Sequence, residues 1–209
     1  MEQVFGLKMV KIINYVSYIL VRGLYYINLY ISKEFRELKI HLTENVSLHL
    51  NKVQLPEQLI NATISIEDKR FYNHNGHDVI SIFRAIINNF SNNRIQGAST
   101  IEQQLVRTIL KNNEQTFKRK YFEILLSSLI FKQFTKTEII NLYLSCYKFH
   151  EKIKGVHVIC EKENYKIDAL TQKDIYEIAA RFKYPMLTKG NYIKYLKRVR
   201  TIEKINNGT

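Results

Sequence analysis

The chain has 209 residues, which suffice for one domain with a sizeable hydrophobic core and leave little room for two full domains. Hydrophobic residues make up 45% of the sequence and charged residues 24%, which argues against a disordered tail and a polytopic membrane protein. With only 7 Gly and 2 Pro, the composition favours a mainly helical fold. The net charge of +13 indicates that the protein binds an anionic partner, such as an anionic polymer, a lipid surface or a phosphate-bearing substrate.

The first predicted element is an apolar helix. Residues 12–31 contain a single charge, Arg22, and twenty residues are the length that spans a bilayer. An arginine at the centre opposes insertion, however, so two interpretations stay open. Residues 1–33 form either a membrane anchor or an amphipathic helix that lies on a surface or packs on the domain.

Residues 34–55 are polar and charged and are interpreted as a connector, with a short strand over Val46 to Leu50 as an option. The rest of the chain, 56–209, is assigned to one helical domain, in which Pro56 occupies the first position of its first helix. Apolar spacing and three capping boxes (Ser99 with Glu102, Thr135 with Glu138, Thr171 with Asp174) predict helices over 56–66, 78–90, 99–110, 117–134 and 192–205, and helices that begin near 135 and 171.

The two cysteines, Cys146 and Cys160, lack the paired spacing of a zinc site and are too few for a disulfide framework. We interpret them as unpaired, partly buried thiols, with a single bridge as the alternative.

Three polar clusters fall outside the helix pattern. They are Glu67 and Asp68 with His74, the stretch 97–100 with Gln103 and Gln104, and Arg119 and Lys120 with Glu123. Each cluster alone is compatible with a solvated helix end, a loop or a cap. Their order and spacing along the chain carry more information than any one of them.

In that order the clusters resemble the motifs of glycosyltransferase family 51, the peptidoglycan transglycosylase domain of class A penicillin-binding proteins and of monofunctional enzymes. The matching residues run from Pro56 to Leu144. They are Glu67-Asp68-x-x-Phe71-x-x-His74-x-Gly76-x-Asp78, Gly97-Ala98-Ser99-Thr100-Ile101-x-Gln103-Gln104-Leu105, Arg119-Lys120-x-x-Glu123, and Lys136-x-Glu138-Ile139-Ile140-x-Leu142-Tyr143-Leu144.

The resemblance implies a lysozyme-like, mainly all-α fold and a defined reaction. This reaction joins lipid II to a growing glycan strand: the 4-hydroxyl of an acceptor sugar attacks the anomeric carbon of the donor, inverts it and expels undecaprenyl pyrophosphate. By resemblance Glu67 is the general base and Glu123 the second catalytic glutamate. An inverting displacement keeps its carboxylates apart, so we predict roughly 6.5 to 10 Å between them.

The same resemblance implies a site for the pyrophosphate and the donor sugar. A divalent cation (Mg²⁺ or Mn²⁺) with Glu123 as its ligand is part of this expectation, and no organic cofactor is. The implied substrate-binding residues are Asp68, His74, Ser99, Gln103, Gln104, Arg107, Lys118, Arg119 and Lys120.

The sequence departs from the family at several positions. Gln115 stands where an arginine is common, so one phosphate contact is either missing or supplied by Lys118. Glu102 replaces a common threonine. Asn141, Ser145 and His150 are also unusual and put full activity in doubt.

Taken together, the sequence predicts a monofunctional peptidoglycan glycosyltransferase on the outer face of a bacterial cytoplasmic membrane. Its expected partners are lipid II, the nascent glycan strand, the membrane and cell-wall synthesis or division proteins, and nucleic acid is not expected. A basic surface that includes Lys194 to Arg200 would rest against anionic lipid. Two alternatives remain: a weakly active or inactive lipid II-binding scaffold, and a lysozyme-like glycan hydrolase.

Overall fold

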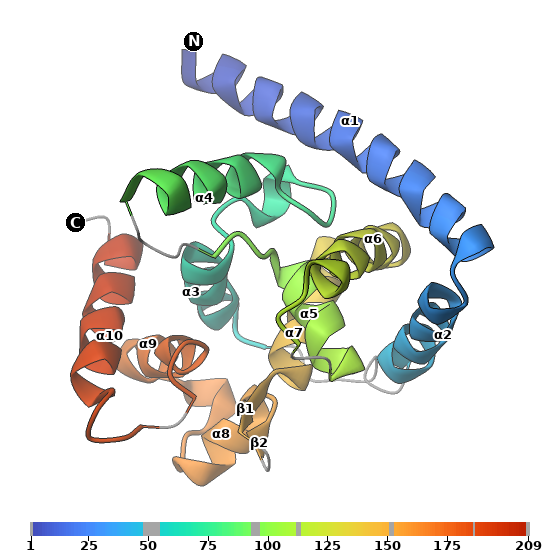
Figure 1. Cartoon of the computed structure of the whole chain (residues 1–209). Coiled ribbons are helices and arrows are strands. Elements are labelled where there is room, and N and C mark those ends of the chain that lie inside the picture. Colours follow the sequence, from blue (N-terminus) through green and yellow to red (C-terminus); the bar gives the residue numbers. More distant parts are fainter. Residues whose placement is uncertain are drawn as a thin grey trace. The chain divides into compact units, whose positions relative to one another are not determined.

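The computed structural model describes residues 2–47, 55–92, 97–111, 114–150, 153–185 and 187–207. Most of these residues are helical, which confirms the prediction of a mainly all-α fold (Figure 1). The strands among them, β1 (Lys148–His150) and β2 (Ile153–Lys154), form one antiparallel pair. The chain divides into two compact units, the first from Met1–Leu50 and Arg70–Ile139, the second from Asn51–Lys69 and Ile140–Thr209.

The first unit is built from helices that pack around buried aromatic and aliphatic side chains. Its centre includes Phe35, whose ring lies 5.5 Å from that of Tyr25 and 5.1 Å from that of Phe122. Its elements are α1 (Glu2–Ile31), α2 (Lys33–Ser47), the 3-10 turn η1 (Phe71–Asn73), α4 (Val79–Asn92), α5 (Ile101–Leu110), α6 (Phe117–Gln133) and the first residues of α7 (Lys136–Cys146).

Helix α2 occupies the segment predicted as a connector. Phe35, Leu42 and Val46 are buried along one stripe of this helix, while the side chains between them are mostly charged or polar. Such a narrow apolar stripe is enough to dock a helix whose overall composition looks like a linker. The optional strand over 46–50 is wrong for Val46 and Ser47, which are helical, and its other residues lie outside the described part of the chain.

The second unit has its core where α3, α9 and α10 pack on one another. Its buried side chains include Leu59, Ile178 and Ile202, one from each of these helices. Within the described residues neither Cys146 nor Cys160 forms a disulfide, and both are buried, as the first interpretation expected. The elements are α3 (Glu57–Glu67), the rest of α7, the β1–β2 pair, α8 (Val156–Lys162), η2 (Ile167–Ala169), α9 (Gln172–Arg181) and α10 (Tyr192–Asn207).

The predicted helix starts are mostly confirmed by their caps. Thr135 and Thr171 accept backbone N–H groups from Glu138 and Asp174, and both acidic side chains accept in return. Pro56 stands at the cap position of α3, just before the helix that it was expected to open. The predicted Ser99 cap is wrong, because the cap of α5 is Thr100, whose side chain accepts the N–H of Gln103.

Candidate active site

Glu67 is the last residue of α3, in the second unit, and it forms an ion pair with α10. Nη2 of Arg198 lies 2.6 Å from Oε1 of Glu67. Both side chains are largely buried. A charge-assisted bond of this length fixes the orientation of the carboxylate, so Arg198 positions the residue predicted as the general base.

Asp68 is the cap residue that follows α3 and is buried, with its backbone N–H bonded to the carbonyl of Ile64 at 3.0 Å. Its place at the helix end agrees with the predicted polar loop, which follows directly. The role of Asp68 in substrate binding stays a prediction.

The loop that follows, in the first unit, is held by buried polar contacts. Nε of Arg70 lies 2.8 Å from Oδ2 of Asp78, and Asp78 also accepts the N–H groups of Ile80 and Ser81 at the start of α4. Burial opposes ionisation of Asp78, but the bonds from Arg70 and Ser81 outweigh it and lower the pKa of this carboxyl. His74 is buried with its ring against Phe71, at 6.2 Å between ring centroids.

Gly76 brings this loop against two helices of the same unit. Its carbonyl accepts a hydrogen bond of 2.7 Å from the hydroxyl of Thr100, and its φ is +92°. A Cβ at this position would lie only 2.6 Å from the carbonyl oxygen of Ser127 in α6. Glycine is therefore required both by the backbone angle and by the close approach.

We expect Gly76→Ala to lower the free energy of unfolding by on the order of 3 kcal/mol, because the strained backbone and the clash with a helix backbone add. Chemical denaturation measures this loss. The matched control is Gly97→Ala, since a Cβ at Gly97 meets no atom within 4 Å and should change stability by less than about 1 kcal/mol. Equal effects of the two substitutions would contradict the assignment.

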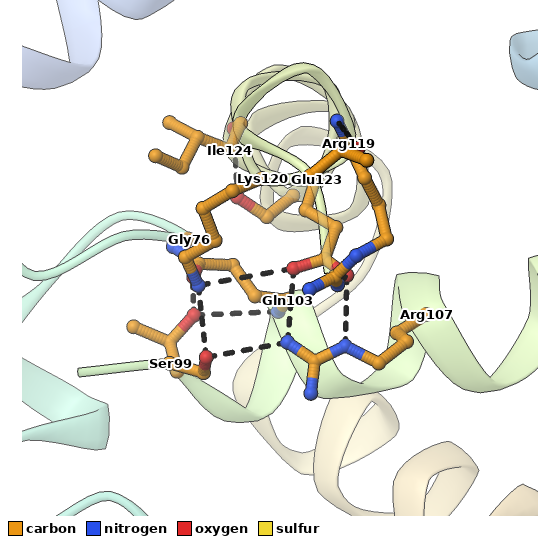
Figure 2. A network of polar contacts seen from close by, with 11 residues as sticks. Gly76, Ser99, Gln103, Arg107, Arg119, Lys120, Glu123 and Ile124 are labelled. Atoms are coloured by element: carbon orange, nitrogen blue, oxygen red, sulfur yellow. Dashed lines mark hydrogen bonds and ion pairs between the residues drawn. The ribbon is translucent and has the colours of Figure 1, made fainter. Parts of the chain in front are cut away.

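The start of α5 contributes two polar side chains to a cluster with α6. Nζ of Lys120 lies 2.8 Å from Oγ of Ser99 and 2.5 Å from Oε1 of Gln103. Nη2 of Arg107 also reaches Ser99, at 3.3 Å. Figure 2 shows these groups converging between the two helices. The second and third predicted motifs thus form a single site.

The centre of this cluster is Glu123, which is 3% exposed. Arg107 binds its carboxylate with two nitrogens, at 2.8 and 3.0 Å, and Arg119 donates to the same group (Figure 2). Nζ of Lys120 lies 3.8 Å away. One buried carboxylate therefore holds three basic side chains in fixed positions, and we name this group, with Ser99 and Gln103, the Glu123 cluster.

Two buried hydrogen-bond donors of the Glu123 cluster have no acceptor among the described residues. They are Nε2 of Gln103 and Nε of Arg119. Buried polar groups are normally paired, and an unpaired one costs about 1 to 3 kcal/mol. Unused donors beside positive charges indicate a site for an oxygen-rich anion.

Burial lowers the pKa of Lys120 to about 8, although the neighbouring Glu123 carboxylate partly opposes this shift. The ammonium form is present below that pH and is lost above it. In contrast, the pKa of His77 falls to about 4 on burial, so this residue is neutral at physiological pH and shares a 2.9 Å hydrogen bond with Ser17.

We expect kcat/KM for a phosphate-bearing substrate to fall above about pH 8, because the free protein then loses the Lys120 charge that attracts the anion. In Lys120→Arg the guanidinium stays charged, so the alkaline fall should move upward by at least about one pH unit. Initial rates over the neutral to alkaline range measure both profiles. Superimposable profiles would exclude Lys120 as the titrating group.

Four predicted binding residues lie outside the Glu123 cluster: Asp68 and His74, described above, and Gln104 and Lys118. Lys118 pairs with Glu34 of α2, and its Nζ lies 5.8 Å from the Phe122 ring centroid, so its role as a phosphate contact stays a prediction. The backbone carbonyl of Gln104 accepts a hydrogen bond from the Thr108 hydroxyl, and its backbone N–H donates to the Thr100 carbonyl. A pocket between α2, α5 and α6 is lined by both Lys118 and Glu123.

The surroundings of Glu123 do not fit the predicted divalent cation. The nitrogens of two guanidinium groups and one ammonium group lie within 4 Å of the oxygens of this carboxylate, so a metal ion bound there would face three positive charges. Cation sites instead gather several oxygen ligands of negative or neutral charge. We therefore place no cation at Glu123.

The sequence did not indicate two ion pairs of this structure. Arg198 was expected on a basic surface, and 131 residues separate it from Glu67. Glu102, expected in a capping box, is fully buried with its Oε1 2.6 Å from Nζ of Lys136. The same ammonium lies 4.2 Å from the ring centroid of Phe71. Only the three-dimensional contacts reveal these partners.

These contacts define a helical protein with a basic cluster suited to a phosphate-bearing ligand, and comparison with known proteins identifies its class. The family model described as Transglycosylase matches residues 33–204. The chain is 40% identical over 136 residues to penicillin-binding protein 1A of Rickettsia typhi, an alignment that covers 63% of this chain and 17% of the relative. It is 39% identical over 102 residues to a monofunctional glycosyltransferase of Staphylococcus aureus (strain Newman), which covers 49% of this chain and 38% of the relative.

The chain therefore belongs to the transglycosylase family, glycosyltransferase family 51, as its motifs predicted. It spans well under half the length of these curated relatives. The matched residues include all of α5 and α6, and with them the Glu123 cluster.

Proposed function

We propose that the chain is a peptidoglycan glycosyltransferase that joins lipid II to a growing glycan strand. The observation that supports this most is the Glu123 cluster, in which three basic side chains surround one carboxylate and two buried donors have no hydrogen-bond partner among the described residues. Family membership supplies the reaction, and the pyrophosphate of lipid II supplies the anion.

In the proposed reaction, the 4-hydroxyl oxygen of the acceptor sugar forms a bond to the anomeric carbon of the donor. The bond from that carbon to the pyrophosphate oxygen breaks with its electron pair, so undecaprenyl pyrophosphate leaves as an anion. The hydroxyl proton passes to Glu67 as the bond forms. Negative charge grows on the leaving oxygen, which Arg107, Arg119 and Lys120 stabilise.

The roles of individual donors follow from their contacts. Arg107 and Lys120 both reach Ser99, so the hydroxyl of Ser99 lies where phosphate oxygens would enter the Glu123 cluster. Gln103 would donate through its unpaired Nε2. Asp68, His74, Gln104 and Lys118 remain expected binding residues, and the separation of Glu67 and Glu123 remains a prediction.

We further propose that the protein acts on the outer face of a bacterial cytoplasmic membrane, where lipid II is polymerised. The nascent glycan strand is then its second substrate, and other cell-wall synthesis or division proteins are its expected partners. The net charge of +13 supports residence at an anionic lipid surface.

Polymerisation of labelled lipid II by the full chain in lipid vesicles tests this proposal. We expect glycan polymer and released undecaprenyl pyrophosphate in stoichiometric amounts, in reactions run with and without Mg²⁺. Binding of lipid II without polymer would identify a scaffold instead. Release of muropeptides from finished sacculi would identify a hydrolase, and either result would overturn the proposal.

A further inference from the structure

Helix α1 places two asparagines toward the protein and most of its large apolar side chains toward the outside. Its inward stripe, at a spacing of three and four residues, contains the buried residues Asn14, Tyr25 and Asn28. The exposed large apolar side chains are Met9, Ile12, Ile13, Tyr15, Val16, Ile19, Leu20, Leu24, Tyr26, Ile27, Tyr30 and Ile31. This is the reverse of the arrangement on a water-exposed surface helix.

The inward stripe is tied to its own unit by specific hydrogen bonds. Asn14 donates to the carbonyl of Asn73 at 3.1 Å and accepts the N–H of Val79 at 3.2 Å. Further along, Asn28 donates to the hydroxyl of Tyr121 at 2.7 Å. The two asparagines are separated by about 21 Å along the helix axis. The helix is thus held against the unit at two well-separated points.

The charges of α1 fit an anionic surface. After Glu2, every charged residue of this helix is basic, namely Lys8, Lys11 and Arg22. The two lysines are exposed. Arg22 folds over the rings of Tyr25 and Tyr26, at 4.5 and 4.8 Å, so its guanidinium lies at the edge of the apolar face. Tyrosine and arginine in this arrangement suit the headgroup region of a bilayer.

No helix among the described residues meets the length and hydropathy expected of a membrane span. We propose that α1 lies in the plane of an anionic lipid surface, with the face of Ile13, Leu20 and Ile27 in the acyl boundary and its asparagine stripe docked on the protein. A helix perpendicular to the bilayer would have to leave the partners of Asn14 and Asn28 or draw them into the hydrocarbon. This inference concerns lipid contact and does not rest on the proposed reaction.

Depth measurements test the proposal sharply, because the chain has no Trp and an introduced one reports alone. We would make Ile13→Trp, Leu20→Trp and Ile27→Trp in the full chain and add vesicles of phosphatidylglycerol and phosphatidylcholine without lipid II. The tryptophan fluorescence of each variant should shift to the blue when vesicles are added. Quenching by lipids brominated at known depths should place all three tryptophans at the same shallow depth. A helix that crosses the bilayer would place Leu20→Trp about 10 Å deeper than the other two, which would overturn the proposal.

A charge substitution provides the second readout. Ile27→Glu should lower partition into these vesicles about tenfold or more, since it removes an apolar side chain from the lipid and adds an anion. Ile40→Glu on α2 is the matched control, because Ile40 is 50% exposed and Ile27 is 53% exposed. Equal losses in the two variants would overturn the assignment of this face.

Sedimentation distinguishes lipid from a second copy of the chain as the occupant of the α1 face. If a second copy covered α1, the chain would sediment as a dimer without vesicles and Leu20→Trp would already emit in the blue, which would contradict lipid as the occupant.

Vesicle binding by Glu67→Gln separates lipid contact from catalysis, because this variant should bind as wild type does. If the wild-type chain did not bind vesicles, this inference would be refuted without any consequence for catalysis. If the chain bound vesicles but did not polymerise lipid II, the inference would stand.

Discussion

Glu67→Gln is expected to lower kcat for lipid II polymerisation by about 10²- to 10⁴-fold, because an amide cannot take up the proton of the attacking hydroxyl. Single-turnover assays with labelled lipid II measure this fall directly. KM should change little, since the anion of the substrate is held by other residues. Glu57→Gln, an exposed position in the first turn of the same helix, is the matched control and should retain full activity.

The ion pair with Arg198 adds a graded version of the same experiment. Arg198→Gln removes the guanidinium that orients Glu67 and should lower kcat, whereas Arg198→Lys keeps a positive charge and should recover part of the loss. A structural role alone would lower the yield of folded protein equally in both variants. Full activity of Glu67→Gln would contradict the role of Glu67 as base.

The second large effect is expected from Glu123→Gln. This change removes the carboxylate that Arg107, Arg119 and Lys120 share and leaves their charges close together with less compensation. Breaking a buried ion pair on one side costs about 3 to 5 kcal/mol, so the unfolding temperature should fall clearly. We also expect polymerisation to drop at least about 100-fold, because the basic groups lose their fixed positions.

Glu34→Gln provides the control for this prediction. It breaks the exposed pair with Lys118, and exposed pairs contribute at most about 1 kcal/mol. Inorganic pyrophosphate should also raise the unfolding temperature of Glu123→Gln more than that of wild type, since it supplies the missing negative charge. A Glu123→Gln variant as stable as Glu34→Gln would show that the carboxylate does not organise the cluster.

The sequence predicted helices well where a cap depends on neighbouring residues alone. Thr135 and Thr171 cap their helices through residues three positions ahead, so local spacing was sufficient. At α5 two adjacent hydroxyls compete, and the distant bond from Thr100 to Gly76 favours Thr100 over Ser99. A tertiary contact of this kind leaves no local pattern in the sequence.

The candidate site shows the same limit. The family resemblance named every member of the Glu123 cluster, Arg107 by its place two residues after the second motif and the others within the matched motifs. The pairing of Lys118 with Glu34 of α2 could not be expected, because that segment was interpreted as a connector, and the role of Lys118 at the phosphate stays a prediction. Arg198 could not be paired with Glu67, since charge patterns do not reveal partners so distant along the chain.

The buried pair of Glu102 and Lys136 also limits how this sequence can evolve. Loss of Lys136 alone would strand an anion in the core, and loss of Glu102 alone would strand an ammonium group against the Phe71 ring. Either single step is costly, whereas a joint change to uncharged residues removes both charges at once. The two positions, 34 residues apart, are therefore expected to co-vary, and a lineage that acquired this pair has difficulty returning one residue at a time.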